Sequence, residues 1–457
     1  MTILFFNPPA RQPVWESLVV PPLGLAYLAA VLRRAGYPVK IRDAFAERMD
    51  WQAVGAYFAA ERPEILAVSS MAPTIDLTFK TLRLARPYVK TMIMGGPQVS
   101  VWGREIFQQC PELDLAVIGE GEETILELVA ALAAGHSPEG IPGVIGRDFH
   151  GPTRRLIKNL DLLPFPAREL LPLRSYRYPF AKTNRVTTLF TSRGCPYHCS
   201  FCDKSVFGSR WRARSSENVL EEITEIVKRF GINSVIIYDD LFTLDHRRVQ
   251  AICEGILQRG YQLDWKCEGR VDLVDFETLK MMKRAGCSMI AYGVETGNQK
   301  GLDYLQKGTK LEQIRQAFSL THRAGLETMA YFILGIPVES FSDELQTIRF
   351  AKEINPTYVQ FSTLSPYCGT RLYQEAAGKN WLRETDARNP MDKDLKRPVV
   401  MSPLWSPEDL QRIMRQAHLS FYLRPGYLLK RLKTLKSPAQ LINASRGLSA
   451  LGRWLLP

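Results

Sequence analysis

Short apolar runs alternate with longer amphipathic stretches along the first third of the chain. A stretch with helical spacing occupies residues 23–35 and ends at Gly36, a residue suited to the position just past a helix. Regular alternation of strands and helices is typical of βαβ units, so residues 1–150 are predicted to form an α/β, doubly wound parallel sheet. The predicted strands are residues 2–6, 39–42, 65–69, 91–94 and 115–118.

A second alternation begins at Val186 and predicts a partial (β/α)6 barrel over residues 186–370. Residues 151–185 contain too many prolines for a helix or a central strand, so they are interpreted as a linker. Residues 371–457 are predicted to form a C-terminal extension with basic amphipathic helices. The strands predicted for the barrel are residues 186–190, 234–238, 263–268, 288–293, 327–333 and 357–361.

The loops after the strands of the first sheet are rich in glycine, proline and serine. Doubly wound sheets bind ligands at the C-terminal ends of their strands, and glycine lets the backbone approach a bulky ligand, although the same residues also suit tight turns. No Gly-x-Gly-x-x-Gly follows a strand, which disfavours a nicotinamide cofactor. The candidate binding residues are Pro8, Pro9, Ser69, Ser70, Gly95, Gly96, Gly119, Glu120, Gly121 and Glu122.

Three cysteines follow the first strand of the second alternation, at Cys195, Cys199 and Cys202. Cysteine thiolates hold iron–sulfur clusters, and a cubane with only three such ligands has one iron open to another molecule. A structural zinc site is the alternative, but it usually needs a second ligand pair, and none is close in the sequence. His198 is interpreted as a loop residue rather than as a ligand.

The cysteine array, with Phe201 before its third cysteine, resembles the signature loop of the radical S-adenosylmethionine (SAM) superfamily. The resemblance implies a [4Fe-4S] cluster whose open iron binds SAM, and cleavage of SAM to a 5′-deoxyadenosyl radical. It implies that Gly293 and Glu295 contact SAM, and that Gly335 and Pro337 lie near its adenine. Phe201 is counted among the cofactor-binding residues on the same ground.

Four further polar residues stand at predicted strand ends of the barrel. Arg270 has the geometry to pair with the SAM carboxylate, or it forms an ion pair at the barrel rim. Asp239 and Asp240 are candidate acid/base groups or caps of their loop. Cys368 is a candidate hydrogen donor or cofactor ligand, or only a small apolar residue.

Residues 1–150 resemble the cobalamin-binding domain that precedes the radical domain in one radical SAM class. The motifs that carry the resemblance are Asn-Pro-Pro, Gly-Gly-Pro and Gly-Glu-Gly-Glu at the strand ends. The wider cobalamin family has an Asp-x-His-x-x-Gly motif whose imidazole binds cobalt from below. Its nearest match here is residues 148–150, where Thr153 replaces the glycine, so we expect cobalamin without a His lower ligand.

Composition refines the picture at the C-terminal end. The net charge is +12. Residues 407–457 contain basic side chains together with those of Leu, Tyr and Trp. Such a segment favours either contact with an anionic membrane surface or a helix packed on the barrel. A uniform nucleic-acid binder is not expected. Eight cysteines are too few for a disulfide scaffold, and the N-terminus lacks the features of a signal peptide, so a reducing, cytoplasmic location is expected, with the tail touching the inner membrane face.

These observations predict a cobalamin-dependent radical SAM enzyme that methylates an unactivated carbon of an apolar, lipid-like, tetrapyrrole or natural-product substrate. Flavodoxin or ferredoxin is the expected electron donor. Ring closure or rearrangement without methyl transfer remains an alternative, as does a non-catalytic cobalamin or redox sensor. A methylthiotransferase would need three more cluster cysteines upstream, where only Cys110 is found.

Overall fold

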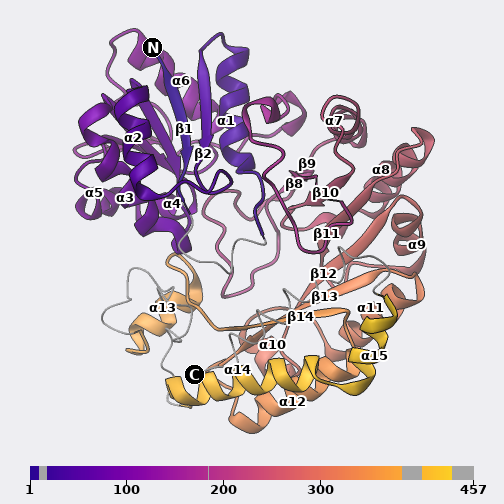
Figure 1. Ribbon diagram of the computed structural model, residues 1–457. Coiled ribbons are helices and arrows are strands. Elements are labelled where there is room, and N and C mark those ends of the chain that lie inside the picture. Colours follow the sequence, from indigo (N-terminus) through magenta and orange to yellow (C-terminus); the bar gives the residue numbers. More distant parts are fainter. Residues whose placement is uncertain (10–17, 184, 383–403, 435–457) are drawn as a thin grey trace. The chain divides into compact units, whose positions relative to one another are not determined.

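The computed structural model describes residues 1–9, 18–183, 185–382 and 404–434. It divides the chain into two compact units (Figure 1). Unit 1 contains Met1–Pro196, Asp203–Leu241 and Gln258–Asp264, and unit 2 contains Tyr197–Cys202, Phe242–Leu257 and Trp265–Pro457. Each unit is described by itself.

Unit 1 contains the predicted doubly wound sheet, with strand order β2-β1-β3-β4-β5-β6. All five predicted strands are confirmed, and a short sixth strand pairs antiparallel with β5 at the edge of the sheet. The strands are β1 (Ile3–Asn7), β2 (Val39–Asp43), β3 (Ile65–Ser69), β4 (Thr91–Gly95), β5 (Leu115–Val117) and β6 (Val144–Gly146).

Helices cover both faces of this sheet, because alternate side chains of each strand point to opposite faces. In β1, Ile3 and Phe5 belong to one buried cluster, whereas Leu4 and Phe6 belong to another. Gly36 adopts φ +88° after α1, which confirms its predicted role at the helix end. The helices are α1 (Leu23–Arg34), α2 (Trp51–Glu61), α3 (Ile75–Ala85), α4 (Pro97–Trp102), α5 (Ile106–Gln109) and α6 (Glu122–Ala133).

The six strands predicted for the barrel are confirmed and lie in the order β14-β13-β12-β11-β10-β7. The described pairings β7/β10, β11/β12, β12/β13 and β13/β14 are parallel, as expected for a βα architecture. The strands are β7 (Val186–Leu189), β10 (Ser234–Ile237), β11 (Asp264–Gly269), β12 (Cys287–Glu295), β13 (Glu327–Leu334) and β14 (Tyr358–Thr363), and a short antiparallel pair joins β8 (Ser192–Arg193) to β9 (Arg212–Ala213).

Helices follow most of these strands. They are α7 (Ser216–Lys228), α8 (His246–Gln258), α9 (Phe276–Arg284), α10 (Gln299–Tyr304), α11 (Leu311–Arg323), α12 (Phe341–Ile354), α13 (Arg371–Gly378), α14 (Pro407–Tyr422) and α15 (Pro425–Thr434). In the part of the chain that the structure describes, no helix is both long and apolar enough to cross a membrane.

The C-terminal segment is partly packed. Leu410, Ile413 and Phe421 of α14 are buried, and the helix contacts α12 and β14, as the packed-helix alternative predicts. In α15, Leu428 and Leu429 are exposed. The last part of the predicted basic tail, residues 435–457, lies outside the described residues.

The compact units divide the chain differently from the predicted domains, because the proline-rich segment and β7 pack with the first sheet's unit. Arg168, in the predicted linker, is fully buried. Its guanidinium pairs with Glu222 of α7 at 2.6 Å and donates to the carbonyl of Thr188 in β7 at 2.7 Å. A buried guanidinium needs such partners, so they tie the linker to the strand and helix that follow it.

Candidate functional site

The loops after β3 and β4 touch each other through their backbones. The N–H of Ser70 donates to the carbonyl of Gly95 at 2.9 Å. Gly96 has φ +101°, and a Cβ at this position would lie 2.5 Å from the carbonyl oxygen of Ser70. The close approach and the backbone conformation therefore both require glycine.

Two buried polar groups at these loops have no partner among the described residues. They are the hydroxyl of Ser70 and the side-chain amide nitrogen of Gln98, which follows β4. Buried polar groups are nearly always hydrogen-bonded, so such groups indicate a ligand or water. Neutral hydrogen-bonding groups beside glycine backbone suit cobalamin, because the rim of cobalamin carries neutral amide groups. Ser69 and Gly95 are partly exposed here, whereas Pro8 and Pro9 after β1 are buried.

Glu120, in the loop after β5, and Glu122, the first residue of α6, are buried and pair with arginines. Glu120 accepts from Arg193 at 2.9 Å and from Arg212 at 2.8 Å, and Glu122 accepts from Arg193 at 2.5 Å. Although burial alone would lower it, the pKa of Arg193 is raised because Glu122 and Glu120 stabilise its charge. Cofactor binding by these two carboxylates stays a prediction, and the structure gives them ion-pair partners. Gly119, in the same loop, donates its N–H to Ser100 at 2.9 Å.

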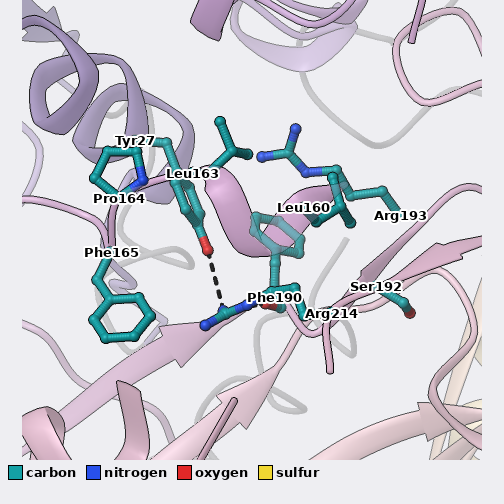
Figure 2. A pocket seen from close by; sticks show the side chains of 9 residues that line it. All are labelled: Tyr27, Leu160, Leu163, Pro164, Phe165, Phe190, Ser192, Arg193 and Arg214. Carbon is teal, nitrogen blue, oxygen red and sulfur yellow. Dashed lines mark hydrogen bonds between the residues drawn. The ribbon is translucent and has the colours of Figure 1, made fainter. Parts of the chain in front are cut away.

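Beside these ion pairs lies a small pocket of unit 1 (Figure 2). The hydroxyl of Tyr27 points toward Arg214, 3.5 Å away (Figure 2). Burial, followed by the nearby charge of Glu222, raises the pKa of Tyr27 to about 12, so this phenol stays protonated. The pocket is lined by Tyr27, Leu160, Leu163, Pro164, Phe165, Phe190, Ser192, Arg193 and Arg214.

Asp239 and Asp240 hold the segment that leads into the cysteine array. The buried carboxylate of Asp239 accepts from the N–H and hydroxyl of Thr191 at 2.6 and 2.5 Å and from the hydroxyl of Ser192 at 2.6 Å. Asp240 accepts from the N–H of Gly194 at 2.8 Å. Loss of water around its carboxyl, then repulsion by Asp239, raises the pKa of Asp240, although much of the side chain is exposed. The contacts are those of the predicted loop caps, and an acid/base role stays a prediction.

The thiols of Cys195, Cys199 and Cys202 are at least partly exposed and form no disulfide, as a metal-binding set requires. In contrast, Cys110, Cys253, Cys267 and Cys287 are buried, as predicted for core thiols. Unit 1 holds Cys195, whose carbonyl accepts from Lys204 at 3.0 Å.

Cys199 and Cys202 belong to unit 2, on a segment that backbone hydrogen bonds hold in place. The N–H of Ser200 donates to Leu305 and its carbonyl accepts from Leu372, both at 2.9 Å. Phe201 packs against the apolar cluster that contains Leu305 and Ile336. Three accessible cysteines this close together in the sequence are a suitable ligand set for a cluster with one open iron.

Arg270 supports the same loop. Its guanidinium carbon lies 3.7 Å from the ring centre of Tyr197, its Nε lies 2.8 Å from Asp272, and it donates to the carbonyl of Lys307. These contacts match the rim ion pair that was the alternative to SAM binding. Pairing of Arg270 with the SAM carboxylate stays a prediction.

The buried pair of Glu295 and Lys307 is the main feature that sequence reasoning missed. Their charged atoms lie 2.6 Å apart, and both side chains are nearly inaccessible to water. A Cβ on Gly293 would lie 2.3 Å from the Glu295 carboxylate, so glycine provides room for the pair. Burial alone would lower the pKa of Lys307, but Glu295 and the nearby Cys199 raise it. The structure therefore places the Lys307 ammonium within electrostatic reach of Cys199, one of the three predicted cluster ligands.

Gly335 and Pro337 lie in the loop after β13, near two buried carboxyl groups, that of Glu339 in the same loop and that of Glu344 in α12. The N–H of Gly335 donates to Glu344 at 2.6 Å, and Thr296 donates to Glu339 at 2.7 Å. Burial raises the pKa of Glu339 to about 7 and that of Glu344 well above its usual value. Cys368 is partly exposed in the loop after β14, beyond Thr363 and before α13.

Two family models match this chain. The B12 binding domain model matches residues 17–129, and the radical SAM superfamily model matches residues 189–351. The first match includes β2 to β5, and the second includes β10 to β13. The fold and site thus define an enzyme class with a [4Fe-4S] cluster, SAM and cobalamin as cofactors.

An uncharacterised methyltransferase of Pyrococcus horikoshii is 34% identical over 94% of this chain and 94% of its own length. The anaerobic magnesium-protoporphyrin IX monomethyl ester cyclase of Cereibacter sphaeroides is 29% identical over 78% of this chain and 60% of its own. The cobalamin-dependent SAM radical enzyme OxsB, solved with aqua-cobalamin and SAM, shares the fold with a TM-score of 0.77 at 19% identity, covering 99% of this chain and 71% of OxsB. The chain belongs to the cobalamin-dependent radical SAM enzyme family.

Proposed function

We propose that this enzyme transfers a methyl group to an unactivated carbon of an apolar small molecule. The observation that carries the proposal is the similarity of nearly the whole chain to a protein named a methyltransferase. The three accessible cysteines and the neutral, glycine-rich loops of the first sheet agree with it, because they suit a cluster and cobalamin respectively.

When bound, the cluster, SAM and cobalamin would supply a 5′-deoxyadenosyl radical and a transferable methyl group. Cys195, Cys199 and Cys202 would hold the cluster as thiolates. Lys307 would favour an anion beside Cys199, such as the carboxylate of SAM, because its charge is retained in a buried place. Glu295 would keep Lys307 in that position and would leave its remaining oxygen for an N–H or O–H donor.

We also propose that cobalamin binds without a histidine lower ligand. His150, in the nearest match to the usual motif, follows β6, whose direction is opposite to that of its neighbour β5. Residues 147–149 thus turn at the N-terminal edge of the parallel strands, and the His150 ring contacts the carbonyl of Gly151 at 2.8 Å. Electron paramagnetic resonance of bound cob(II)alamin should lack splitting from a histidine nitrogen, and its presence would overturn this proposal.

Ring closure without methyl transfer is the second candidate. It is favoured by the similarity to a cyclase that acts on a magnesium porphyrin ester. Both candidates need radical formation and an apolar substrate, and they differ in whether the substrate radical receives a methyl group or closes a ring.

The deciding experiment is anaerobic reconstitution with iron, sulfide and hydroxocobalamin, followed by reduction in the presence of SAM. Formation of both 5′-deoxyadenosine and S-adenosylhomocysteine supports methyl transfer, since one SAM makes the radical and another supplies the methyl group. Formation of 5′-deoxyadenosine alone favours ring closure. Formation of neither product by protein with an intact cluster contradicts both candidates and supports a sensor.

The apolar substrate class agrees with a peripheral membrane contact through α15. Leu428 and Leu429 are exposed at 38% and 60% on this helix. Basic residues follow them in the sequence, and such a segment suits an anionic interface. Flotation with vesicles of phosphatidylglycerol and phosphatidylcholine should carry the full chain upward, and protein that remains at the bottom contradicts the contact. A flavodoxin or ferredoxin as electron donor remains a prediction.

A further inference from the structure

Four charged side chains of unit 1 form one buried cluster, here called the Glu120–Arg193 network. Its members are Glu120, Glu122, Arg193 and Arg212, and each has a side chain no more than 7% exposed. Glu120 accepts from both arginines, and Glu122 accepts from Arg193. The network therefore joins the loop after β5 to the hairpin of β8 and β9, although Glu120 and Arg193 are 73 residues apart in the sequence.

The carboxylate of Glu120 is held from several sides. Arg212 donates to both of its oxygens, at 3.0 and 2.8 Å, and the N–H of Ile157 donates to one of them at 2.8 Å. Arg212 also donates to the carbonyl of Ile157 at 2.6 Å. Charged hydrogen bonds in a buried place are strong and directional, so Glu120 has little freedom to move without Arg193 and Arg212.

Arg193 is separated from the cluster cysteine Cys195 only by Gly194, and this connection is rigid. Gly194 has φ +81°, and a Cβ there would lie 2.4 Å from the carbonyl oxygen of Arg210. Its N–H is bound by Asp240 at 2.8 Å, and the carbonyl of Cys195 is bound by Lys204 at 3.0 Å. These contacts leave Gly194 little freedom to absorb a shift of the Arg193 backbone before it reaches Cys195.

We propose that Arg193 is a positioning residue that couples residues 119–122, in the cobalamin domain, to the cluster cysteine Cys195. A bound cluster fixes Cys195 and, through the network, orders the loop after β5, so cobalamin binds more tightly. Linkage requires the reverse effect as well, because a binding coupling is reciprocal. The inference rests on the proposed binding of cobalamin at the strand-end loops of the first sheet.

The test is the affinity of the full-length protein for hydroxocobalamin, with and without the cluster. Anaerobic titrations followed by absorbance should give a dissociation constant at least about fivefold lower for cluster-loaded wild type than for chelator-stripped wild type. Glu120→Gln keeps the shape of the side chain but removes its charge, so the ratio should fall to about one.

Glu222→Gln is the matched control in the same unit. Glu222 is fully buried and also binds two arginines, Arg168 and Arg214, but it lies in neither connected loop. This variant should keep the wild-type ratio. If Glu120→Gln does not fold by circular dichroism, Glu122→Gln, which removes only a contact to Arg193, should lower the ratio instead.

A wild-type ratio of one, with cobalamin bound in both forms, overturns the coupling and leaves the proposed function intact. Equal ratios in wild type and the folded Glu120→Gln or Glu122→Gln variant overturn it too, as does an equal loss in Glu222→Gln. Failure of both wild-type forms to bind hydroxocobalamin overturns the proposed cobalamin site together with the coupling.

Discussion

The strand-end loops of the first sheet and those of unit 2 present different chemistry. Around β3 and β4, the groups are neutral, consisting of glycine backbone, serine hydroxyls and the amide of Gln98. In unit 2, the corresponding loops carry thiols, Arg270 and the buried ion pair of Glu295 with Lys307. Neutral groups suit the amide rim of cobalamin, whereas thiolates and a buried cation suit a metal cluster and a charged ligand.

Two sets of buried carboxyl groups, one in each unit, also differ in their partners. In unit 1, Glu120 has two arginine partners. In unit 2, Glu339 and Glu344 accept hydrogen bonds from Thr296 and Gly335, and one oxygen of each has no partner among the described residues. A buried carboxyl group without a cation retains its proton to a higher pH, which is why the pKa is raised for both.

The largest difference between the two units is expected when a cysteine of the array is replaced. Cys199→Ala removes one cluster ligand of unit 2, so iron content and reductive cleavage of SAM should fall to background. Hydroxocobalamin should still bind, with the weaker affinity expected of cluster-free protein, because the first sheet is unchanged. The control is Cys253→Ala, which alters a buried core thiol and should retain iron. Full iron content in Cys199→Ala would contradict the assignment.

Lys307→Met tests the buried charge of unit 2. Removal of one partner from a buried ion pair costs about 3–5 kcal/mol, because Glu295 remains without its cation. We expect weaker SAM binding by equilibrium dialysis and a lower thermal midpoint. Lys300→Met is the control, since Lys300 is 51% exposed in its pair with Asp343 and such pairs contribute about 1 kcal/mol or less. Equal effects of both substitutions would argue against a special role of Lys307.

Gly96→Ala tests the neutral loops of the first sheet. The new Cβ would meet the backbone of Ser70, in a conformation that itself costs an L-residue about 1–2 kcal/mol. Hydroxocobalamin affinity should fall at least about tenfold, while iron content stays at the wild-type value. Gly36→Ala separates the two causes, because Gly36 has φ +88° but no neighbouring atom within 4 Å. Unchanged cobalamin affinity in Gly96→Ala would place the cofactor elsewhere.

The protonated carboxyl groups predict a pH dependence of stability. Glu339 has its pKa raised from 4.5 to about 7, so the folded state holds a proton that the unfolded state releases. Stability should therefore fall as the pH rises from about 5 to 7, by about 2 kcal/mol from this group alone. Glu339→Gln should remove that part of the decrease in denaturant titrations at both pH values. An unchanged decrease would show that Glu339 is already ionised in the folded state.

Cys368→Ala should have the smallest effect. If Cys368 acts only as a small residue of the loop after β14, formation of 5′-deoxyadenosine and S-adenosylhomocysteine should be unchanged. A substantial loss of either product, at wild-type iron and cobalamin content, would give this thiol a role in the reaction.

The fold was predictable because the periodicity of strands and helices is a local property of the sequence. The bounds of each predicted strand agree with the observed strand within a few residues. The edge strand β6 was missed because it has only three residues, too few to show alternation. The compact units could not be predicted either, since they depend on buried ion pairs such as that of Arg168 with Glu222.

The site was predictable where the spacing of residues in the sequence alone indicates their chemistry, as it does for the three cysteines. Lys307 carries no such signal, because it stands 12 residues after Glu295 and meets it only through the fold of the chain. Glu120 shows the opposite difficulty. Its position after a strand suggested a ligand contact. The residue that pairs with its carboxylate, Arg193, is distant in the sequence, so this ion pair could not be predicted.

The contact between Gly335 and α14 limits how this protein can evolve. A Cβ at Gly335 would lie 2.5 Å from a methyl group of Leu410. The left-handed backbone of Gly335, with φ +84°, further disfavours other residues. Among descendants of this sequence, a larger residue at 335 is tolerable only with a smaller one at 410. The two positions should therefore covary. In a lineage that loses the C-terminal helix, the contact with Leu410 no longer restricts residue 335, and only the backbone conformation does.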